Sequence, residues 1–334
     1  MEGQVLGQVG ALGSAMADVA VQRERNRRLR LRRVATGLGV VAGWMLLRAL
    51  LGHPVVLGPP HLPAALAAYF PAILLVLLLS AAILVPMLGA GRSPHVLYRP
   101  GEIDVSLADV KGAGVVVEEV VKTLNLFLAF KTFRERMGGS PRRAILFEGP
   151  PGTGKTYMAK AMAREAGVPF LFVSSSAFQS MYYGQTNRKI RSYFKALRKA
   201  AREEGGAIGF IEEIDAIGAA RSGMGASTGR EGISGVVNEL LIQLQSFDTP
   251  TGGRRMRNWG IDRVNRWVPT HRQLDAPRPH AANILVIGAT NRAEDLDPAL
   301  MRPGRFDRAI YFDLPSRSGR REIIDYYLAR RLAS

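Results

Sequence analysis

The octapeptide at positions 149–156, Gly-Pro-Pro-Gly-Thr-Gly-Lys-Thr, constrains the fold more than any other stretch of this chain. It follows a short apolar run, precedes a helical pattern and fits the phosphate-loop pattern G-x-x-x-x-G-K-[ST]. Its glycines let the backbone wrap round a polyphosphate, so that successive N–H groups and the following helix N-terminus face the phosphates. The stretch therefore predicts a nucleotide site rather than a bare turn.

The residues of this loop divide the work of binding a nucleotide and its metal. Lys155 supplies a mobile cation for the phosphates, and the Thr156 hydroxyl is a candidate ligand for Mg²⁺. The predicted cofactor is thus a nucleoside triphosphate with Mg²⁺. The predicted nucleotide contacts are Gly149, Pro150, Pro151, Gly152, Thr153, Gly154, Lys155 and Thr156.

Two apolar segments lie N-terminal to the phosphate loop and resemble membrane spans. Seven arginines and one glutamate occupy positions 23–33, immediately before the apolar run 34–51, which contains Arg48. No Asp, Glu, Lys or Arg lies between Ala49 and Gly91, and 70–90 is long enough to cross a ~30 Å hydrocarbon core. The alternatives are a signal peptide and a buried core helix. We expect instead a basic cytoplasmic segment 1–33, whose first 20 residues are weakly ordered, and a transmembrane hairpin 34–91 with spans 34–51 and 70–90.

The flanks of the hairpin predict its orientation. Arginines precede the first span, and Arg92 and Arg99 follow the second, whereas the connection at 52–69 has no Lys or Arg. By the positive-inside rule, the N-terminus and the soluble domain both lie in the cytoplasm and the protein is a two-span membrane protein. The lipid bilayer is therefore one predicted partner.

After a linker at 92–108, an α/β pattern occupies residues 109–334. Alternating strands and helices predict right-handed crossovers, a parallel sheet and ligands at the strand carboxyl ends. The predicted strands are 144–147, 170–174, 207–211 and 284–289. The predicted helices are 115–133, 155–166, 186–201 and 235–247.

Acidic residues follow one of these strands, where the second element of a phosphate site belongs. We assign Glu212 to Mg²⁺ and Glu213 to the water that attacks the γ-phosphate, because adjacent carboxylates suit phosphoryl transfer to water. Asn291, after the strand 284–289, is a candidate to bind the same water or the γ-phosphate. Taken alone, an Asn at that place is more often a turn residue.

These motifs, with residues 289–292 (Ala-Thr-Asn-Arg) and 297–308 (Asp-Pro-Ala-Leu-Met-Arg-Pro-Gly-Arg-Phe-Asp-Arg), stand in the order and spacing of the AAA+ ATPase module. Together with the hairpin, the chain resembles the FtsH-type membrane-anchored AAA+ proteases from about residue 104 onward. The resemblance implies an AAA+ P-loop NTPase of three layers with a parallel sheet, ATP hydrolysis and self-assembly into a ring, by family a hexamer. It also implies that Arg302 and Arg305 are arginine fingers that reach the neighbouring subunit's γ-phosphate; the alternative is an ordinary surface salt bridge.

The resemblance also assigns residues that grip the protein substrate and residues that lie beside the adenine of the nucleotide. Tyr182, Tyr183 and Gly184 stand where the family has a pore loop that grips protein substrates, although two tyrosines there could equally pack into a core. Asp109 and Val110 correspond to the family's segment beside the adenine, where the following Lys111 is a departure.

Other departures concern the metal and the rest of the family's architecture. Glu212 replaces the usual Asp and reaches one methylene further, which puts ideal Mg²⁺ geometry in doubt. Residues 249–282 form a basic insertion with seven arginines. No His-Glu-x-x-His motif is present and the chain has no cysteine, so we expect no zinc site, and no lid or protease domain, in this sequence.

We therefore predict a membrane-anchored ATPase that unfolds or translocates protein substrates, the motor part of an FtsH-like zinc metalloprotease. Alternatives are a non-proteolytic remodelling ATPase of membrane proteins and an inactive nucleotide-binding subunit of a mixed ring. A nucleic-acid motor is a further alternative, motivated by the basic insertion 249–282 in a chain of net charge +17, although the hairpin and the pore-loop tyrosines argue against it. The basic residues form local clusters rather than one stripe, which argues against nucleic acid as a partner.

Overall fold

The computed structural model describes residues 2–52, 64–89, 93–130, 143–178, 185–218, 230–245 and 283–332, with a few single positions from 259 to 267. The predicted pore-loop residues Tyr182, Tyr183 and Gly184 lie outside the described residues. So does nearly all of the insertion 249–282.

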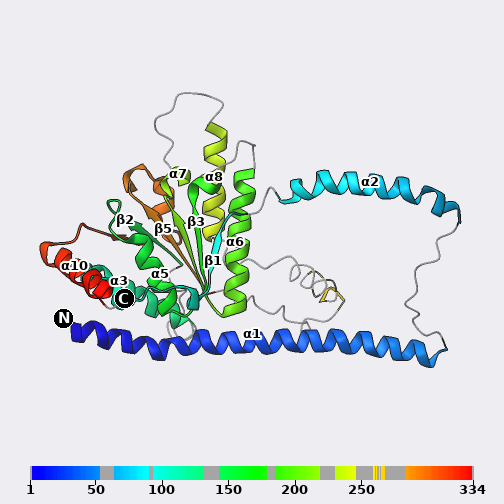
Figure 1. The fold of residues 1–334 in the computed structure, drawn as a ribbon, viewed down its shortest axis with the longest axis horizontal. Coiled ribbons are helices and arrows are strands. Elements are labelled where there is room, and N and C mark those ends of the chain that lie inside the picture. The colour runs from blue at the N-terminus through cyan, green and yellow to red at the C-terminus, as the bar shows by residue number, and fades with distance from the viewer. Residues whose placement is uncertain are drawn as a thin grey trace.

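A six-stranded sheet forms the centre of the soluble domain (Figure 1), with the strand order β1-β3-β4-β5-β2-β6. Every neighbouring pair is parallel except β1 with β3. The expectation of a wholly parallel sheet was therefore wrong at one edge, because β1 enters the sheet without a crossover helix. The strands are β1 Val96–Tyr98, β2 Ala144–Glu148, β3 Phe170–Ser174, β4 Ala207–Glu212, β5 Ile284–Thr290 and β6 Ala309–Tyr311.

Helices cover both faces of this sheet, because alternate strand residues point to opposite sides. In β2, Ile145 and Phe147 pack into a core with α3 and α5, whereas Ala144 and Leu146 pack into a second core with α6 and α8. The domain thus has the three predicted layers. The longer helices of the domain are α3 Gly114–Leu128, α5 Lys155–Glu165, α6 Gln185–Glu204, α8 Arg230–Gln245 and α10 Arg317–Leu332.

Short helices connect the strands near their ends. The expected inner strands and their helices match the structure to within a few residues at each end. The edge strands β1 and β6 were missed, because three residues are too few for a periodic signal. The short helices are η1 Pro100–Glu102, η2 Leu107–Asp109, η3 Ser175–Phe178, α7 Asp215–Gly218, η6 Ala293–Asp295 and η7 Pro298–Met301.

The segment 92–108 is not a free linker. Its strand β1 pairs with β3 in the main sheet, and Ile103 and Leu107 are buried in the core beside α3 and α5. The prediction of a linker was wrong here because the proline and serine content hid a three-residue edge strand. The sheet and core of the α/β domain therefore include residues from Val96 onward.

The N-terminal region is one long helix, α1, from Glu2 to Leu50. Residues 1–20 were expected to be weakly ordered, and in the structure residues 2–20 are part of this helix. The part of α1 around Val19 packs against α3 and α6, and Val19 itself is buried in the core. Tertiary contact therefore stabilises a helix that its own composition did not predict.

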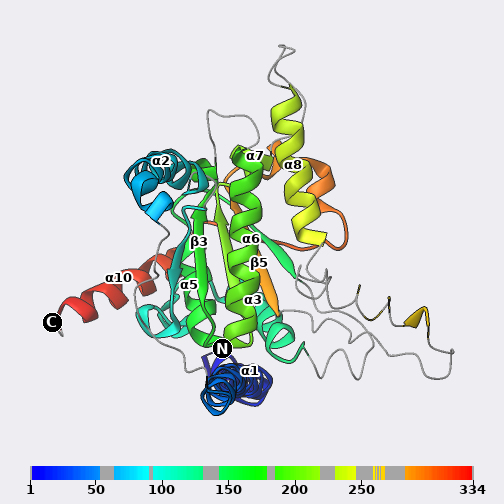
Figure 2. The same cartoon turned by 90° about the vertical axis from the view of Figure 1, so that its right-hand side faces the viewer.

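The apolar end of α1 and the helix α2 (Ala64–Gly89) extend from the domain along similar directions, and both are seen end-on in Figure 2. Among the described residues, one stretch, Val19–Leu50, is long and apolar enough to cross a membrane. The stretch Tyr69–Ala82 of α2 is apolar but shorter. The structure therefore contains one candidate span, and a second span stays a prediction.

Candidate nucleotide-binding site

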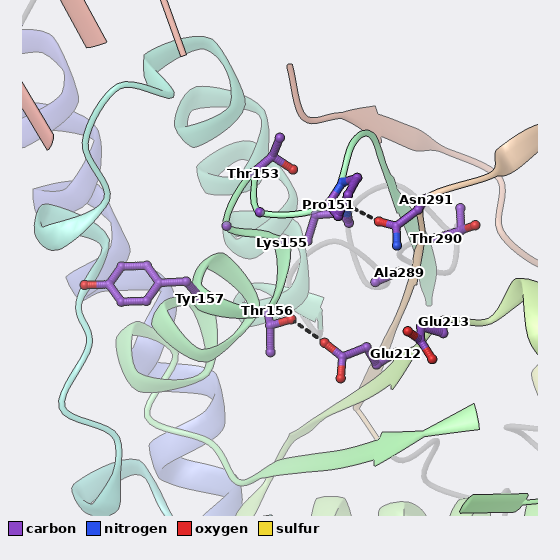
Figure 3. A pocket seen from close by; sticks show the side chains of 12 residues that line it. Pro151, Thr153, Lys155, Thr156, Tyr157, Glu212, Glu213, Ala289, Thr290 and Asn291 are labelled. Atoms are coloured by element: carbon purple, nitrogen blue, oxygen red, sulfur yellow. Dashed lines mark hydrogen bonds between the residues drawn. The ribbon is translucent and has the colours of Figure 1, made fainter. Parts of the chain in front are cut away.

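The strands β4, β5 and β2 are neighbours in the sheet, and their carboxyl ends meet above one cavity of about 380 Å³ (Figure 3). Residues predicted from three separate motifs therefore come together at one place. The cavity is lined by Pro151, Gly152, Thr153, Gly154, Lys155, Thr156, Tyr157, Glu212, Glu213, Ala289, Thr290 and Asn291.

Glycine is required at the start of the phosphate loop. Gly149 has a φ of 140°, and a Cβ added there would lie 2.1 Å from the backbone oxygen of Phe312. Gly154, at the N-cap of α5, has a φ of 85°. Other residues rarely adopt these angles, so the glycines set the path that lets α5 begin directly at Lys155.

The Lys155 side chain is folded over the loop and 9% exposed. Its Nζ donates hydrogen bonds to the backbone oxygens of Gly149 (2.7 Å) and Pro150 (2.8 Å) and to Oδ1 of Asn291 (2.9 Å). Burial lowers the pKa of Lys155, and the nearby charge of Glu212 opposes that shift. The ammonium group is therefore held beside the cavity by weak neutral acceptors that anionic phosphates can replace.

Oxygen atoms suited to a hard cation lie on the opposite wall. The Thr156 hydroxyl donates to Oε1 of Glu212 at 2.8 Å, so the two predicted metal ligands are adjacent (Figure 3). A carboxylate beside a hydroxyl, at the edge of a phosphate site, fits the oxygen ligands that Mg²⁺ prefers. The extra methylene of Glu212 does not prevent its carboxylate from reaching Thr156.

Glu213 and Asn291 line the same cavity from the turns that follow β4 and β5. Beneath them, the buried Thr290 hydroxyl donates to Oδ1 of Asp215 (2.8 Å) and accepts from the Arg292 amide (2.9 Å). These bonds tie the turn after β5 to the turn after β4. Thr290 and Asp215 were not predicted site residues, and their position within two residues of Asn291 and Glu213 was the only signal in the sequence.

Asp109 and Val110 do not line the cavity. Asp109 accepts hydrogen bonds from Ser106 (2.7 Å) and from the Tyr326 hydroxyl of α10 (2.9 Å). Burial alone would raise the pKa of Asp109, but these hydrogen bonds outweigh it and lower the pKa. Tyr157, which sequence reasoning missed, lies at the cavity edge with its ring directed away from the phosphate loop (Figure 3).

Tyr157 connects the cavity edge to this Asp109 cluster. Burial raises the pKa of Tyr157 to about 12, with further contributions from Tyr326, to which it is hydrogen-bonded, and from Asp109. Asp109 is therefore bound to α10 through Tyr326 and lies near Tyr157 of α5.

The two predicted arginine fingers have different environments. Arg305 Nη1 donates to the Ala299 backbone oxygen at 2.6 Å, and its guanidinium lies 3.1 to 3.2 Å from the Gln245 amide oxygen in that amide's favourable orientation. Arg302 is exposed, and neither the hydrogen bonds nor the ion pairs among the described residues include its side chain. Neither arginine lines the nucleotide cavity of its own chain.

The fold and this site define a phosphate-loop nucleotide-binding protein with acidic and amide residues at the ends of adjacent strands. Over residues 145–314, just over half of the chain, the sequence matches the family described as "ATPase family associated with various cellular activities (AAA)". The chain therefore belongs to the AAA ATPase family.

Curated relatives place the chain more narrowly. It is 38% identical over 233 residues to ATP-dependent zinc metalloprotease FtsH 1 of Symbiobacterium thermophilum, covering 70% of this chain and 33% of that protein. It is 39% identical over 224 residues to FtsH 3 of Sorangium cellulosum (67% and 31%), and 37% identical over 234 residues to FtsH of Streptococcus pneumoniae (70% and 30%). The ATPase part is thus of the FtsH type, and the chain spans about a third of the length of these relatives.

Proposed function

We propose that this chain is an ATP-hydrolysing motor, anchored in a membrane, that acts on protein substrates. The observation that carries the proposal is the meeting of Lys155, Glu212, Glu213 and Asn291 at one cavity, from three adjacent strand ends. Phosphoryl transfer to water needs little covalent chemistry from the protein and depends on positioning and charge. The cavity contains the Lys155 cation, the Glu212 carboxylate that we propose for the metal and the Glu213 carboxylate that we propose for the water.

Each residue has a separate role in the proposed reaction. Lys155 and the loop amides bind the β- and γ-phosphates. Thr156 and Glu212 would hold Mg²⁺, which supplies charge neutralisation when bound. Glu213 accepts a proton from the attacking water, and Asn291 orients that water or the γ-phosphate.

The reaction also calls for a second subunit. Arg302 is exposed and does not line the cavity of its own subunit. We therefore propose that it enters the cavity of a neighbouring copy in a ring. A cation supplied in trans stabilises charge that develops in the transition state. Hydrolysis then depends on assembly, for which a hexamer is the family's arrangement.

Anchoring and substrate handling complete the proposal. The apolar end of α1 supports one membrane span, and α2 is proposed as the second, with the ATPase domain on the side of the arginines at 23–33. Tyr182 is proposed to grip protein substrates, with Tyr183 and Gly184 beside it. The name zinc metalloprotease belongs to the relatives, and a proteolytic role here would require a zinc domain joined to this motor.

Substitution of the base separates hydrolysis from binding. In the full chain in detergent or lipid, Glu213→Gln should reduce ATP turnover by roughly 100-fold or more, because the water loses its proton acceptor. ATP affinity, measured with a fluorescent analogue, should remain unchanged, whereas Lys155→Ala should weaken it. Wild-type turnover in Glu213→Gln would refute the assignment of the base. The wild-type measurement in the same experiment tests the inactive-subunit alternative, which predicts no turnover even before substitution.

A further inference from the structure

A buried serine holds the backbone of the proposed base. Ser175 lies in η3, directly after β3, and its side chain is fully buried (0% exposed). Its Oγ donates a hydrogen bond to the backbone oxygen of Glu213 at 2.5 Å. The sheet register explains this meeting, because Ser174 is paired with Glu212 in the parallel strands β3 and β4. Ser175 and Glu213, the residues that directly follow these two strands, therefore lie at the same level.

The backbone at Glu213 is in an unfavourable conformation. Its φ is 53°, and among the described residues it is the one residue other than glycine with a positive φ. In this region the Cβ of an L-residue crowds the following carbonyl oxygen, so the conformation persists only where the surroundings hold it. Strained backbone of this kind is concentrated at functional sites.

Three hydrogen bonds hold this turn. Besides the bond from Ser175, the Glu213 oxygen accepts one from the Ala216 amide at 3.0 Å. The amide of the following residue, Ile214, donates to the Ala289 oxygen at 2.9 Å, and the Ile214 side chain is fully buried. The bonds from Ala216 and Ile214 are backbone contacts that most substitutions retain. The bond from Ser175 is the one made by a side chain.

We infer that Ser175 is a positioning residue for hydrolysis: its hydroxyl holds Glu213 in the left-handed conformation that directs the carboxylate into the nucleotide cavity. The inference rests on the proposed function, in which Glu213 is the base. Removing the hydroxyl leaves a buried carbonyl without one of its donors and lets φ relax toward negative values. The carboxylate then moves from the attacking water, and a displacement of ~1 Å is enough to reduce a rate by roughly 100-fold.

A role that is only structural makes different predictions. If Ser175 merely completed a buried hydrogen bond, its loss would loosen the strand ends and weaken nucleotide binding along with turnover. A positioning role affects an interaction made in the transition state, so it lowers kcat and leaves the KM for ATP unchanged. The ratio of these effects distinguishes the two roles.

The experiment compares Ser175→Ala with Ser176→Ala in the full chain. Ser176 is exposed and its hydroxyl contacts the Ser174 hydroxyl at 2.7 Å, so the control removes the same group from the residue next to Ser175 without touching the bond to Glu213. We expect Ser175→Ala to lower kcat by roughly 10-fold or more with KM unchanged. Ser176→Ala should stay within about twofold of wild type. Equal kcat in the two variants, or a parallel change of kcat and KM in Ser175→Ala, would overturn the inference.

A double-mutant cycle that combines Ser175→Ala with Glu213→Gln distinguishes failure of the inference from failure of the proposed function. Once the base is gone, adding Ser175→Ala should not lower the residual rate or ATP affinity further, whereas a structural role would lower both. If Glu213→Gln retains wild-type turnover, the proposed function fails first. If Glu213→Gln is inactive and Ser175→Ala is not, the positioning role alone is wrong.

Amide hydrogen exchange gives a readout that does not need turnover. In nucleotide-free protein, Ser175→Ala should speed exchange of the Ala216 amide, whose acceptor is the Glu213 oxygen, and Ser176→Ala should not. Should the chain hydrolyse no ATP by itself, this comparison decides whether Ser175 holds the turn. Unchanged exchange in both variants would then reject the inference.

Discussion

Gly149 and Gly152 of the phosphate loop both have positive φ values, 140° and 79°, but their surroundings differ. A Cβ at Gly149 would collide with the Phe312 backbone at 2.1 Å, whereas nothing lies within 4 Å of a Cβ at Gly152. Gly149→Ala should therefore destabilise the domain by about 2 to 4 kcal/mol, combining strain with a backbone clash. Gly152→Ala, with strain alone, should cost about 1 kcal/mol. Denaturant unfolding checks both values, and equal losses would contradict the clash.

Arg302 and Arg305, the two arginines of the Met-Arg-Pro-Gly-Arg segment, should contribute differently to stability. Denaturant unfolding measures this difference. Arg305→Ala removes the contacts to Ala299 and Gln245 and should lower the free energy of unfolding by about 1 kcal/mol or more. Arg302→Ala touches an exposed side chain and should leave stability within about 0.5 kcal/mol. If ATP turnover falls in Arg302→Ala without loss of stability, Arg302 acts in catalysis rather than in folding. A stability loss in Arg302→Ala that equals the loss in Arg305→Ala would reject this division of roles.

At the scale of elements, α1 is joined to the ATPase domain on the side away from the nucleotide cavity. Arg23 and Asn26 of α1 donate hydrogen bonds to backbone oxygens at the C-terminal end of α6: Arg23 to Glu204 (3.2 Å) and Asn26 to Arg202 (2.5 Å). Arg23 also donates to the Gly167 oxygen after α5 and forms a 3.1 Å ion pair with Glu204. A basic side chain near two helix C-termini satisfies free carbonyls and favours both dipoles.

A pair of glycines tests this contact. Gly205 and Gly167 both follow a helix with positive φ, 86° and 60°. A Cβ at Gly205 would lie 2.5 Å from the Val19 oxygen of α1, whereas nothing lies within 4 Å of a Cβ at Gly167. Both alanine variants should pay ~1 kcal/mol of backbone strain, but only Gly205→Ala should release α1.

The release can be measured by photo-crosslinking. A Cβ at Gly205 would lie 3.3 Å from the Cβ of Gln22, so a photoreactive residue at position 22 should capture the peptide 202–206 in the wild type. Gly205→Ala should reduce this product and Gly167→Ala should not. A probe at the exposed Val21 serves as the negative control, since that side chain points away from the contact. Equal capture from positions 21 and 22 would contradict the docked arrangement.

The whole molecule is the scale at which the proposed trans arginine belongs. An Arg302→Ala subunit has an intact cavity of its own, and a Lys155→Ala subunit has an intact Arg302. Each variant alone should lose ATP turnover, whereas mixed rings should recover part of it, because some cavities then combine Lys155 with a neighbour's Arg302. Turnover after co-assembly, compared with rings mixed from Lys155→Ala and the doubly substituted subunit, checks this. No recovery in the first mixture would argue against a finger in trans.

A second whole-molecule property is a chain of side-chain contacts that joins α6 to α8 and α8 to Arg305. Arg191 and Arg198 of α6 contact Glu239 (3.0 Å) and Gln243 (2.6 Å) of α8. The last residue of α8, Gln245, then meets Arg305. Arg191 and Arg198 of α6 therefore help to fix α8 in place.

Much of the nucleotide site was predictable because its residues belong to compact motifs. The phosphate loop, Glu212 with Glu213, and Asn291 each follow an apolar strand, and parallel strands bring their carboxyl ends to one edge. Their meeting at one cavity was therefore implied by local pattern and a general rule of topology. Tyr157, Thr290 and Asp215 were adjacent to these motifs but carried no distinctive spacing, so pattern alone did not select them.

The amino-acid sequence by itself determined that this chain builds an AAA ATPase core with a phosphate loop, because glycine spacing and strand periodicity are properties of short contiguous stretches. Only the tertiary structure decided that Arg305 is bound within its own subunit while Arg302 is exposed, that α1 docks on Gly205, and that Ser175 holds Glu213 at a φ of 53°. Each of these depends on residues from separate elements meeting in space. A hydrogen bond or a clash of that kind has no signature in any local window of sequence, since its free energy exists only when the folded chain brings both partners together.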